Sequence, residues 1–354
     1  MSTSGSTVTA SADELAVTAE RCAAQLLCGD PAGSAEEVTR RLLAVQAQDP
    51  RGARLAIRAR SAGVSASDVD AALARRSLVV SWLNRGTLHL VSAEDYWWLH
   101  PLTNPQLQTG STRRLGQEGV PPDDAERGVA ALQAALAADG PLTRAQLRDR
   151  VAAAGVRTDG QALVHLLVLA SIRGLIVRGP MAAKDHAFAL TRDWLGAPPP
   201  PLDRDAALGE LARRYLAGHA PAADRDLAKW AGIGLRDARL GLARCGARQR
   251  ADGLAELPGG QERAAAALPP PRLLGAFDPL LLGWASRASI VGMHRHIVTD
   301  NGLFRPFALA GGRAVATWTF AGGRVALTPF APLDAGTSAA LETDAVDVAR
   351  FLAG

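Results

Sequence analysis

The strongest constraint on the fold of this 354-residue chain is an order of elements that recurs along it. Each repeat starts with helices whose first turns carry a capping residue, and it ends with two short apolar segments around turn residues. Helices followed by a strand pair are the order of a winged helix. Because the spacing of the repeats is irregular, the pattern indicates a tandem array of domains rather than a solenoid. We therefore expect a mainly α protein with β elements, an α+β fold that contains three tandem winged helices.

The first unit is expected at residues 12–120. Ser34 and Glu37 form a capping-box pattern, which predicts the start of a helix that Pro50 ends. Two apolar segments joined by Asn-Arg-Gly then predict a hairpin, with strands over 78–83 and 87–91.

The same order is expected again at residues 121–200 and 201–268. In the second unit, helices lead to apolar segments over 175–178 and 186–190. Proline-rich stretches near 198–201 and 269–271 separate the later units. Residues 1–11 are expected to be a disordered tail.

The C-terminal segment, residues 269–354, has a different pattern. Apolar segments alternate with glycine pairs, which predicts an antiparallel meander with tight turns. Its strands are expected at 307–310, 314–320 and 325–330, and a final helix is expected at 344–352. We expect this β-rich element to follow the three helical units.

Arginine greatly outnumbers lysine in this chain, and the arginines are clustered. Lysine stands only at positions 184 and 229, so 37 of the 39 basic residues are arginine, and the formal net charge is +4. Arginine pairs with phosphate bidentately and stacks on bases, so a nucleic acid fits as a partner. The codon usage of a GC-rich genome produces the same bias. Placement is more informative than the total, because six arginines lie within residues 40–60 against one acid, Asp49.

Several classes of protein are excluded by what the sequence lacks. Three cysteines are too few for a disulfide scaffold and fit a reducing cytoplasm. No signal-peptide pattern opens the chain, and no uninterrupted apolar stretch approaches the roughly 18 residues of a membrane span. A zinc quartet, a Walker A loop and a nucleophile elbow are also absent from the sequence. We expect a cytoplasmic protein that needs no metal ion or cofactor.

One segment combines polar amides with this local charge. Gln46 and Gln48 stand two residues apart before Pro50, and on a regular helix their side chains would point to opposite faces. We expect the helix to unwind before Pro50, so that both amides point the same way. The nearby arginines would then form a positive surface beside two neutral hydrogen-bonding groups. A solvated helix end with scattered arginines is the alternative.

Four motifs, in order along residues 15–330, carry a family resemblance. They are Gln-Ala-Gln-Asp-Pro at 46–50, Trp-Leu-Asn-Arg-Gly-Thr-Leu-His-Leu-Val at 82–91, Leu-Gly-Ala-Phe-Asp-Pro at 274–279 with Leu282, and Gly-Arg at 312–313 with Thr-Trp at 317–318. The chain resembles the AlkZ/YcaQ-like winged-helix DNA glycosylases. Its Gln-x-Gln motif resembles the AlkZ branch, since the YcaQ branch has Asp in place of the second glutamine.

The resemblance implies a C-shaped arrangement of three winged helices and a β-rich element around a concave basic surface for double-stranded DNA. It implies a monofunctional DNA glycosylase that hydrolyses the N-glycosidic bond of N7-alkylguanine in base excision repair. Members protect producers of DNA-alkylating natural products, a form of antibiotic self-resistance, and some unhook interstrand crosslinks. Three units on one chain make a monomer the simplest expectation.

The expected chemistry needs no titrating side chain. A glycosidic bond breaks through an oxocarbenium-like state, and carboxylates usually assist. N7-alkylguanine is already a cation whose departure neutralises it, so no general acid is required. Glutamine offers a carbonyl acceptor and two N–H donors, which suffice to hold a water near C1′. We expect Gln48 to hold this water and Gln46 to assist; Asp49 is the rival base, although a capping role fits it better.

DNA contacts are expected around these glutamines, on the first wing and beside the C-terminal meander. The candidates are Arg51, Arg54, Arg58, Arg85, His89, Arg295, Arg305 and Arg313. A structural contact between His89 and the backbone is an equal alternative. The aromatic residues Trp82, Trp97 and Trp98 are expected to belong to the core rather than to stack on bases.

Two other functions stay open from the sequence. A winged-helix transcription regulator would explain the basic patches and the tandem domains, but it leaves the Gln-x-Gln motif and the β-rich end unexplained. A non-enzymatic protein that binds the adduct or the toxin is the third class. Release of free base from alkylated DNA separates the enzyme from both.

Overall fold

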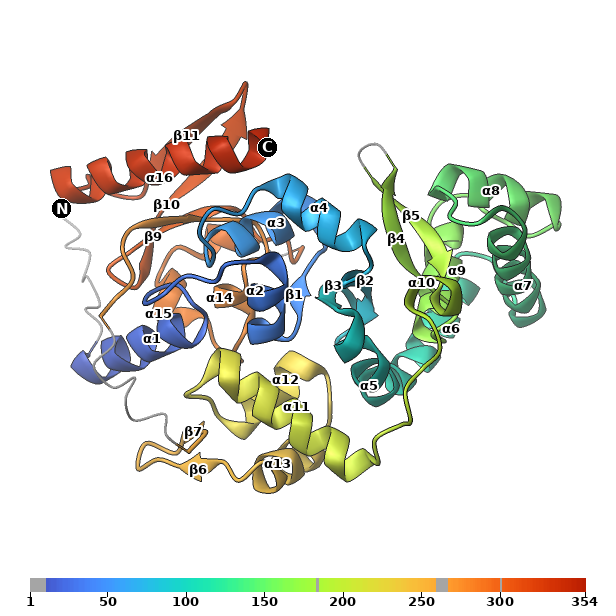
Figure 1. Cartoon of the computed structure of the whole chain (residues 1–354), viewed down its shortest axis with the longest axis horizontal. Helices are drawn as coiled ribbons and strands as arrows, with labels where there is room; N and C mark the ends of the chain where they lie inside the picture. The colour runs from blue at the N-terminus through green and yellow to red at the C-terminus, as the bar shows by residue number, and fades with distance from the viewer. Residues whose placement is uncertain (1–10, 183–184, 259–266, 300) are drawn as a thin grey trace, which may run out of the picture.

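The computed structural model describes residues 11–182, 185–258, 267–299 and 301–354, without the side chain of Arg295. The chain combines helices with antiparallel sheets (Figure 1), which confirms the expected α+β class. The expected N-terminal tail falls on residues 1–10, outside the described part. Ser11 already belongs to the fold, because its hydroxyl accepts a hydrogen bond from the Glu14 amide and caps the first helix.

The N-terminal part of the chain contains the expected hairpin. Its strands pair from Leu78↔Ser92 to Leu83↔Thr87. Gly86 closes the turn with a φ of 78°, a conformation that glycine adopts without strain. The elements here are α1 (Ala12–Ala24), α2 (Ala35–Leu42), β1 (Val45–Gln46), α3 (Pro50–Arg58), α4 (Ala66–Ala74), β2 (Leu78–Leu83), β3 (Thr87–Ser92), α5 (Ala93–Thr103), the 3-10 helix η1 (Pro105–Leu107) and α6 (Gln108–Gln117).

Helix α2 ends earlier than the sequence indicated. The prediction of a helix that continues to Pro50 is wrong, because Leu43 has a φ of 65°, outside the right-handed helical region. The next residues pair with β3 through Val45↔Leu90 and Gln46↔His89. Every residue from 42 to 47 is buried, so apolar spacing alone does not distinguish a helix from a strand here. The first glutamine therefore lies on an edge strand and the second just beyond it.

The hairpins of the first two expected units join in one sheet, in the order β1-β3-β2-β4-β5. Val80 of β2 and Arg178 of β4 are the paired residues between the two hairpins. The second unit contains α7 (Pro122–Asp139), α8 (Arg144–Ala153), α9 (Ala162–Ile172), β4 (Ile176–Ala182), β5 (Asp185–Leu190) and α10 (Thr191–Leu195). The third contains α11 (Arg204–His219), α12 (Asp224–Ala231), α13 (Leu235–Arg244) and the two-stranded sheet of β6 (Arg248–Gln249) and β7 (Ala255–Glu256).

The C-terminal meander is confirmed, with two additions. Its strands form a sheet in the order β11-β10-β9-β8, and β8 was not predicted. The final helix begins well before residue 344, because the Asp334 carboxylate accepts a hydrogen bond from the Thr337 amide (2.8 Å) and caps it. The elements are β8 (Arg272–Leu274), α14 (Pro279–Leu282), α15 (Ala288–Val291), the 3-10 helix η3 (Arg295–Ile297), β9 (Phe307–Ala310), β10 (Arg313–Ala321), β11 (Arg324–Pro329) and α16 (Ala335–Ala353).

Two arginines bind the C-terminal segment to the N-terminal unit. Arg58 at the end of α3 donates to Asp344 and Asp347 of α16, which contacts α3 and α4 (Figure 1). Arg60 donates two hydrogen bonds of 2.9 and 2.8 Å to the Asp278 carboxylate, and both side chains are 0% exposed. Part of the arginine cluster at 40–60 therefore serves packing, since these charges are compensated in the interior.

A buried histidine makes the stability of this fold sensitive to acid. The His219 ring is stacked on Tyr215, its Nδ1 lies 3.1 Å from the Tyr215 carbonyl oxygen, and its Nε2 lacks a partner among the described residues. Burial lowers the pKa of His219 to about 3. Between pH 6.5 and 3 the unfolded chain therefore binds a proton that the folded chain does not, so stability falls as the pH falls.

We expect His219→Phe to reduce this acid sensitivity. The ring keeps its stacked position on Tyr215 but no longer titrates. The slope of the unfolding free energy against pH, measured by urea denaturation between pH 4 and 6, should drop by one proton, about 1.4 kcal/mol per pH unit. An unchanged slope would show that His219 is protonated in the folded protein.

Candidate active site

The two candidate glutamines lie at the end of an edge strand and two residues further along the chain. Gln46 is the last residue of β1, and the Ala47 amide donates to the Leu88 carbonyl of β3 (2.7 Å), so the pairing with β3 continues to residue 47. Side chains two residues apart along a strand point to the same face. The expected unwound helix end is instead a segment paired with β3, and a common direction of the two amides stays a prediction.

Both glutamine carbonyls are held by donors. Gln46 Oε1 accepts a hydrogen bond from Arg85 Nη2 (3.3 Å), and Gln48 Oε1 accepts one from the Leu88 amide (3.2 Å). Guanidinium and backbone N–H groups can only donate, so in each case the carbonyl oxygen, not the amide nitrogen, faces the protein. Gln46 is 7% exposed whereas Gln48 is an exposed residue. Each oxygen retains a second lone pair, and the Gln48 amide lies where a substrate can reach it.

Arg85 connects Gln46 to the end of helix α12. Its Nη1 donates to the carbonyls of Lys229 and Trp230 in the last turn of that helix, while its Nη2 donates to Gln46. Burial lowers the pKa of Arg85, and the nearby positive charge of Arg287 lowers it further. Arg85 was predicted to contact DNA; in the structure its guanidinium donates to Gln46 and to two carbonyls of the protein.

Asp49 caps helix α3. Its Oδ1 accepts a hydrogen bond from the Arg51 amide (3.1 Å), which is the capping role that the sequence favoured over that of a base. Gly52 follows in the first turn, and a Cβ there would lie 2.2 Å from the Ala276 carbonyl oxygen. The Leu-Gly-Ala-Phe-Asp-Pro motif thus packs directly on the helix that follows the glutamines.

Three predicted DNA contacts have buried side chains, which leaves little of their surface for DNA. Arg54 pairs with Asp70, and Arg58, which is 2% exposed, pairs with Asp344 and Asp347. His89 is also 2% exposed, and burial lowers its pKa to about 3, so the ring is uncharged at neutral pH. Its Nδ1 lies 2.9 Å from the Thr87 carbonyl oxygen, which is the structural alternative the sequence left open.

The remaining arginine candidates lie at or near the surface. Arg51 is exposed with its guanidinium over the Phe320 ring (5.9 Å), and Arg305 is exposed between η3 and β9. Arg313 is half-buried at the start of β10 and is engaged with the protein. The side chain of Arg295 lies outside the described part of the chain. A DNA contact by any of these four stays a prediction.

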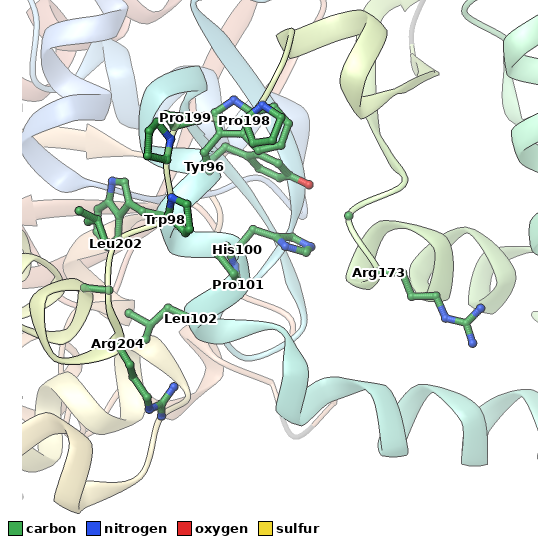
Figure 2. A pocket seen from close by; sticks show the side chains of 15 residues that line it. Tyr96, Trp98, His100, Pro101, Leu102, Arg173, Pro198, Pro199, Leu202 and Arg204 are labelled. Atoms are coloured by element: carbon green, nitrogen blue, oxygen red, sulfur yellow. The ribbon is translucent and has the colours of Figure 1, made fainter.

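The predicted core tryptophans divide into two kinds. Trp82 is buried in a hydrophobic core. Trp97 and Trp98 are half-buried and line a cavity of about 730 Å³ between α5 and the proline-rich segment at 198–202 (Figure 2). Neither candidate glutamine lines this cavity. The cavity is therefore a feature separate from the glutamine pair.

Two basic residues that adjoin Arg85 were not predicted from the sequence. Lys229 is on α12 and Arg287 directly precedes α15. Neither belongs to a run of basic residues, so local clustering could not find them. The Lys229 carbonyl accepts from Arg85 Nη1, and the charge of Arg287 lowers the pKa of Arg85 after burial, while Arg85 Nη2 donates to Gln46.

Comparison with known proteins gives three consistent matches. The family model described as "DNA glycosylase AlkZ-like" matches residues 39–351. An interstrand DNA cross-link repair glycosylase from Streptomyces sahachiroi is 29% identical over 348 residues, which cover 90% of each chain. The solved structure of Streptomyces sahachiroi DNA glycosylase AlkZ superposes with a TM-score of 0.77 at 26% identity, over 95% of this chain and 96% of the other. Within the described residues, no helix is both long and apolar enough to cross a membrane.

Proposed function

Because this chain belongs to the AlkZ-like DNA glycosylase family, we propose that it hydrolyses the N-glycosidic bond of N7-alkylguanine in double-stranded DNA. The observation that carries this proposal is the pair of amides at Gln46 and Gln48, whose oxygens are held by Arg85 and by the Leu88 amide. The product would be a free base and an abasic site, the first step of base excision repair. We further propose that the protein acts as a cytoplasmic monomer.

Two uncharged amides fit a substrate that is already positively charged. An N7-alkylated guanine leaves as a neutral base, so it needs no proton from a general acid. The positive charge that develops on the deoxyribose is stabilised by dipoles that are fixed in advance. Unmodified guanine is a much poorer leaving group, and two amides offer it no acid. The selectivity for alkylated DNA would therefore come mainly from the chemistry of the substrate.

Gln48 is the better placed residue to hold the attacking water. Its oxygen is fixed by the Leu88 amide and keeps a second lone pair, which can accept a hydrogen bond from a water at C1′. Gln46 is more buried and is held by Arg85, so we assign it the assisting role, in which it helps to orient the water held by Gln48. Positioning a water in this way lowers the entropic part of the barrier without a titrating base.

We propose crosslinked guanines as part of the substrate range. The Streptomyces relative is named an interstrand DNA cross-link repair glycosylase. A guanine tethered to the opposite strand cannot be rotated fully out of the duplex, so such a substrate requires a reachable site. The exposed side chain of Gln48 meets that requirement. The role of the protein would then be self-resistance to a DNA-alkylating natural product.

Incubation with a duplex that contains one N7-methylguanine tests the proposed function. We expect release of free N7-methylguanine, an alkali-labile abasic site, and no release from the matched unmodified duplex. A transcription regulator would bind one DNA sequence and release no base, and an adduct-binding protein would retain the base on the DNA. No release from methylated DNA or from a bulkier N7 adduct would contradict the enzymatic proposal.

The role of Arg85 can be separated from that of a DNA contact. We expect Arg85→Gln to lower the single-turnover rate of base release about 10- to 100-fold, because Gln46 loses its donor, with little change in DNA affinity. Arg85→Lys retains one donor and should recover part of the rate. A variant that loses affinity but keeps its rate would show that Arg85 binds DNA and does not orient Gln46.

A further inference from the structure

Phe277 combines an aromatic side chain with a strained backbone. Its φ is 57°, in the left-handed region that a bulky side chain rarely adopts. The residue is half-buried, and in the described part of the chain it belongs to neither hydrophobic cluster, although every other phenylalanine, tryptophan and tyrosine lies in one of them or packs against one. Packing in a core therefore does not explain the strain, and strain of this kind is concentrated at functional sites.

The residues on either side of Phe277 are fixed in the interior. Asp278 forms the buried pair with Arg60, and the Ala276 carbonyl lies so close to Gly52 that a Cβ there would be 2.2 Å from its oxygen. The left-handed residue between them allows the chain to keep both contacts while the Phe277 ring stays outside the buried clusters.

The chain that leads to Phe277 runs along helix α3 toward its N-terminal end. The Leu273 carbonyl accepts a hydrogen bond from Arg58 in the last turn of the helix (2.7 Å). Three residues later, the Ala276 carbonyl contacts Gly52 in the first turn. Helix α3 begins just after the second candidate glutamine. The turn at Phe277 therefore lies at the helix end that follows the glutamine pair.

The ring of Phe277 is supported from within the protein. The centroid of the Phe304 ring lies 5.2 Å from that of Phe277, with an angle of 38° between the rings. Phe304 packs against a buried cluster, and the Arg287 guanidinium lies over its ring at 5.1 Å. An aromatic side chain that is fixed in this way loses little entropy when it stacks on a further flat group. The half-buried state of Phe277 leaves part of its surface for such a group.

On the basis of the proposed function, we propose that Phe277 stacks on a nucleobase next to the lesion and holds that base step open. The ligand class is the flat face of a base in double-stranded DNA, which every base offers, so the contact is independent of sequence. Phenylalanine is one of the apolar residues that proteins insert between base steps to unstack a duplex. Opening the step would expose C1′ to the glutamines even where a crosslink prevents full rotation of the guanine.

Substitution of Phe277 separates this role from a structural one. We expect Phe277→Gly to lower the single-turnover rate of N7-methylguanine release about 10- to 100-fold, because the stacking contact is lost. The midpoint of thermal unfolding should equal or exceed that of the wild type, since glycine adopts a positive φ without strain. Phe277→Leu keeps an apolar side chain without a flat face and should lose a similar rate, whereas Phe277→Tyr should retain it. Wild-type rates in both Phe277→Gly and Phe277→Leu would overturn the proposal.

The stacking contact can also be observed without catalysis. The probe is a duplex with 2-aminopurine next to a 2′-fluoro analogue of N7-methylguanosine, whose glycosidic bond resists cleavage. Saturating wild-type protein or Phe277→Tyr should raise the fluorescence of 2-aminopurine as its base step opens, and saturating Phe277→Gly should not. An equal rise with Phe277→Gly would contradict the stacking role. A rise with wild-type protein that releases no base from N7-methylguanine would contradict the proposed function alone.

Discussion

The variant Gln46→Ala/Gln48→Ala is expected to lose base release from N7-methylguanine almost completely. Loss of one fixed hydrogen-bonding group at a reacting centre costs about 100- to 1000-fold in rate, and groups that act as a unit are not additive. We expect Gln48→Ala to account for most of the loss, because the Gln48 amide is the exposed one. Single-turnover release of the free base measures the effect.

An isosteric change identifies which atom of Gln48 matters. Gln48→Glu keeps an oxygen that can accept from the Leu88 amide and from a water, but it removes the N–H donors. If the carbonyl holds the water, this variant should retain activity that Gln48→Ala lacks. Equal loss in both would assign the role to the amide nitrogen. The thermal unfolding of Gln48→Ala and Gln48→Glu should match that of the wild type, since Gln48 lies outside the core.

The second large effect is expected on stability. Asp278→Ala should destabilise the protein by about 3–5 kcal/mol, because it leaves the charge of Arg60 buried and unpaired. The same carboxylate accepts a hydrogen bond from the Leu280 amide (2.9 Å) at the start of α14, so the cap of this short helix is lost as well. The free energy of unfolding from urea denaturation measures the loss.

A matched surface pair provides the control for this effect. Glu210→Gln breaks the exposed pair of Arg213 and Glu210, which should cost less than about 1 kcal/mol. Arg60→Met/Asp278→Leu removes both buried charges and should recover part of the stability. A loss of under 1 kcal/mol in Asp278→Ala would show that water reaches Arg60 in the folded protein.

The sequence predicted the order of helices and strands because those signals are local. Capping residues, turn residues and apolar alternation all act within a few positions, and the hairpin over 78–92 illustrates this. The end of helix α2 was predicted too late in the chain, because the helix stops where Val45 and Gln46 pair with β3. That pairing joins segments about 45 residues apart and leaves no local signal.

The candidate site was predicted by residue type and only in part by position. Gln46 and Gln48 were singled out because two amides beside many arginines are unusual. The arginine cluster at 40–60 does not form a surface patch as a whole. Arg58 and Arg60 pair with acids 286 and 218 residues away. The partners of Arg85 on α12 could not be predicted for the converse reason, because the fold brings together residues about 145 positions apart.

The most direct measurement is mass spectrometry of the products from a duplex with one N7-methylguanine at limiting substrate. We expect one equivalent of free N7-methylguanine and one abasic strand for the wild-type protein, and neither for Gln46→Ala/Gln48→Ala. Intact methylated strand after incubation with folded, DNA-binding wild-type protein would contradict the proposed glycosylase activity. Equal release by the wild type and the double variant would contradict the assignment of the two glutamines.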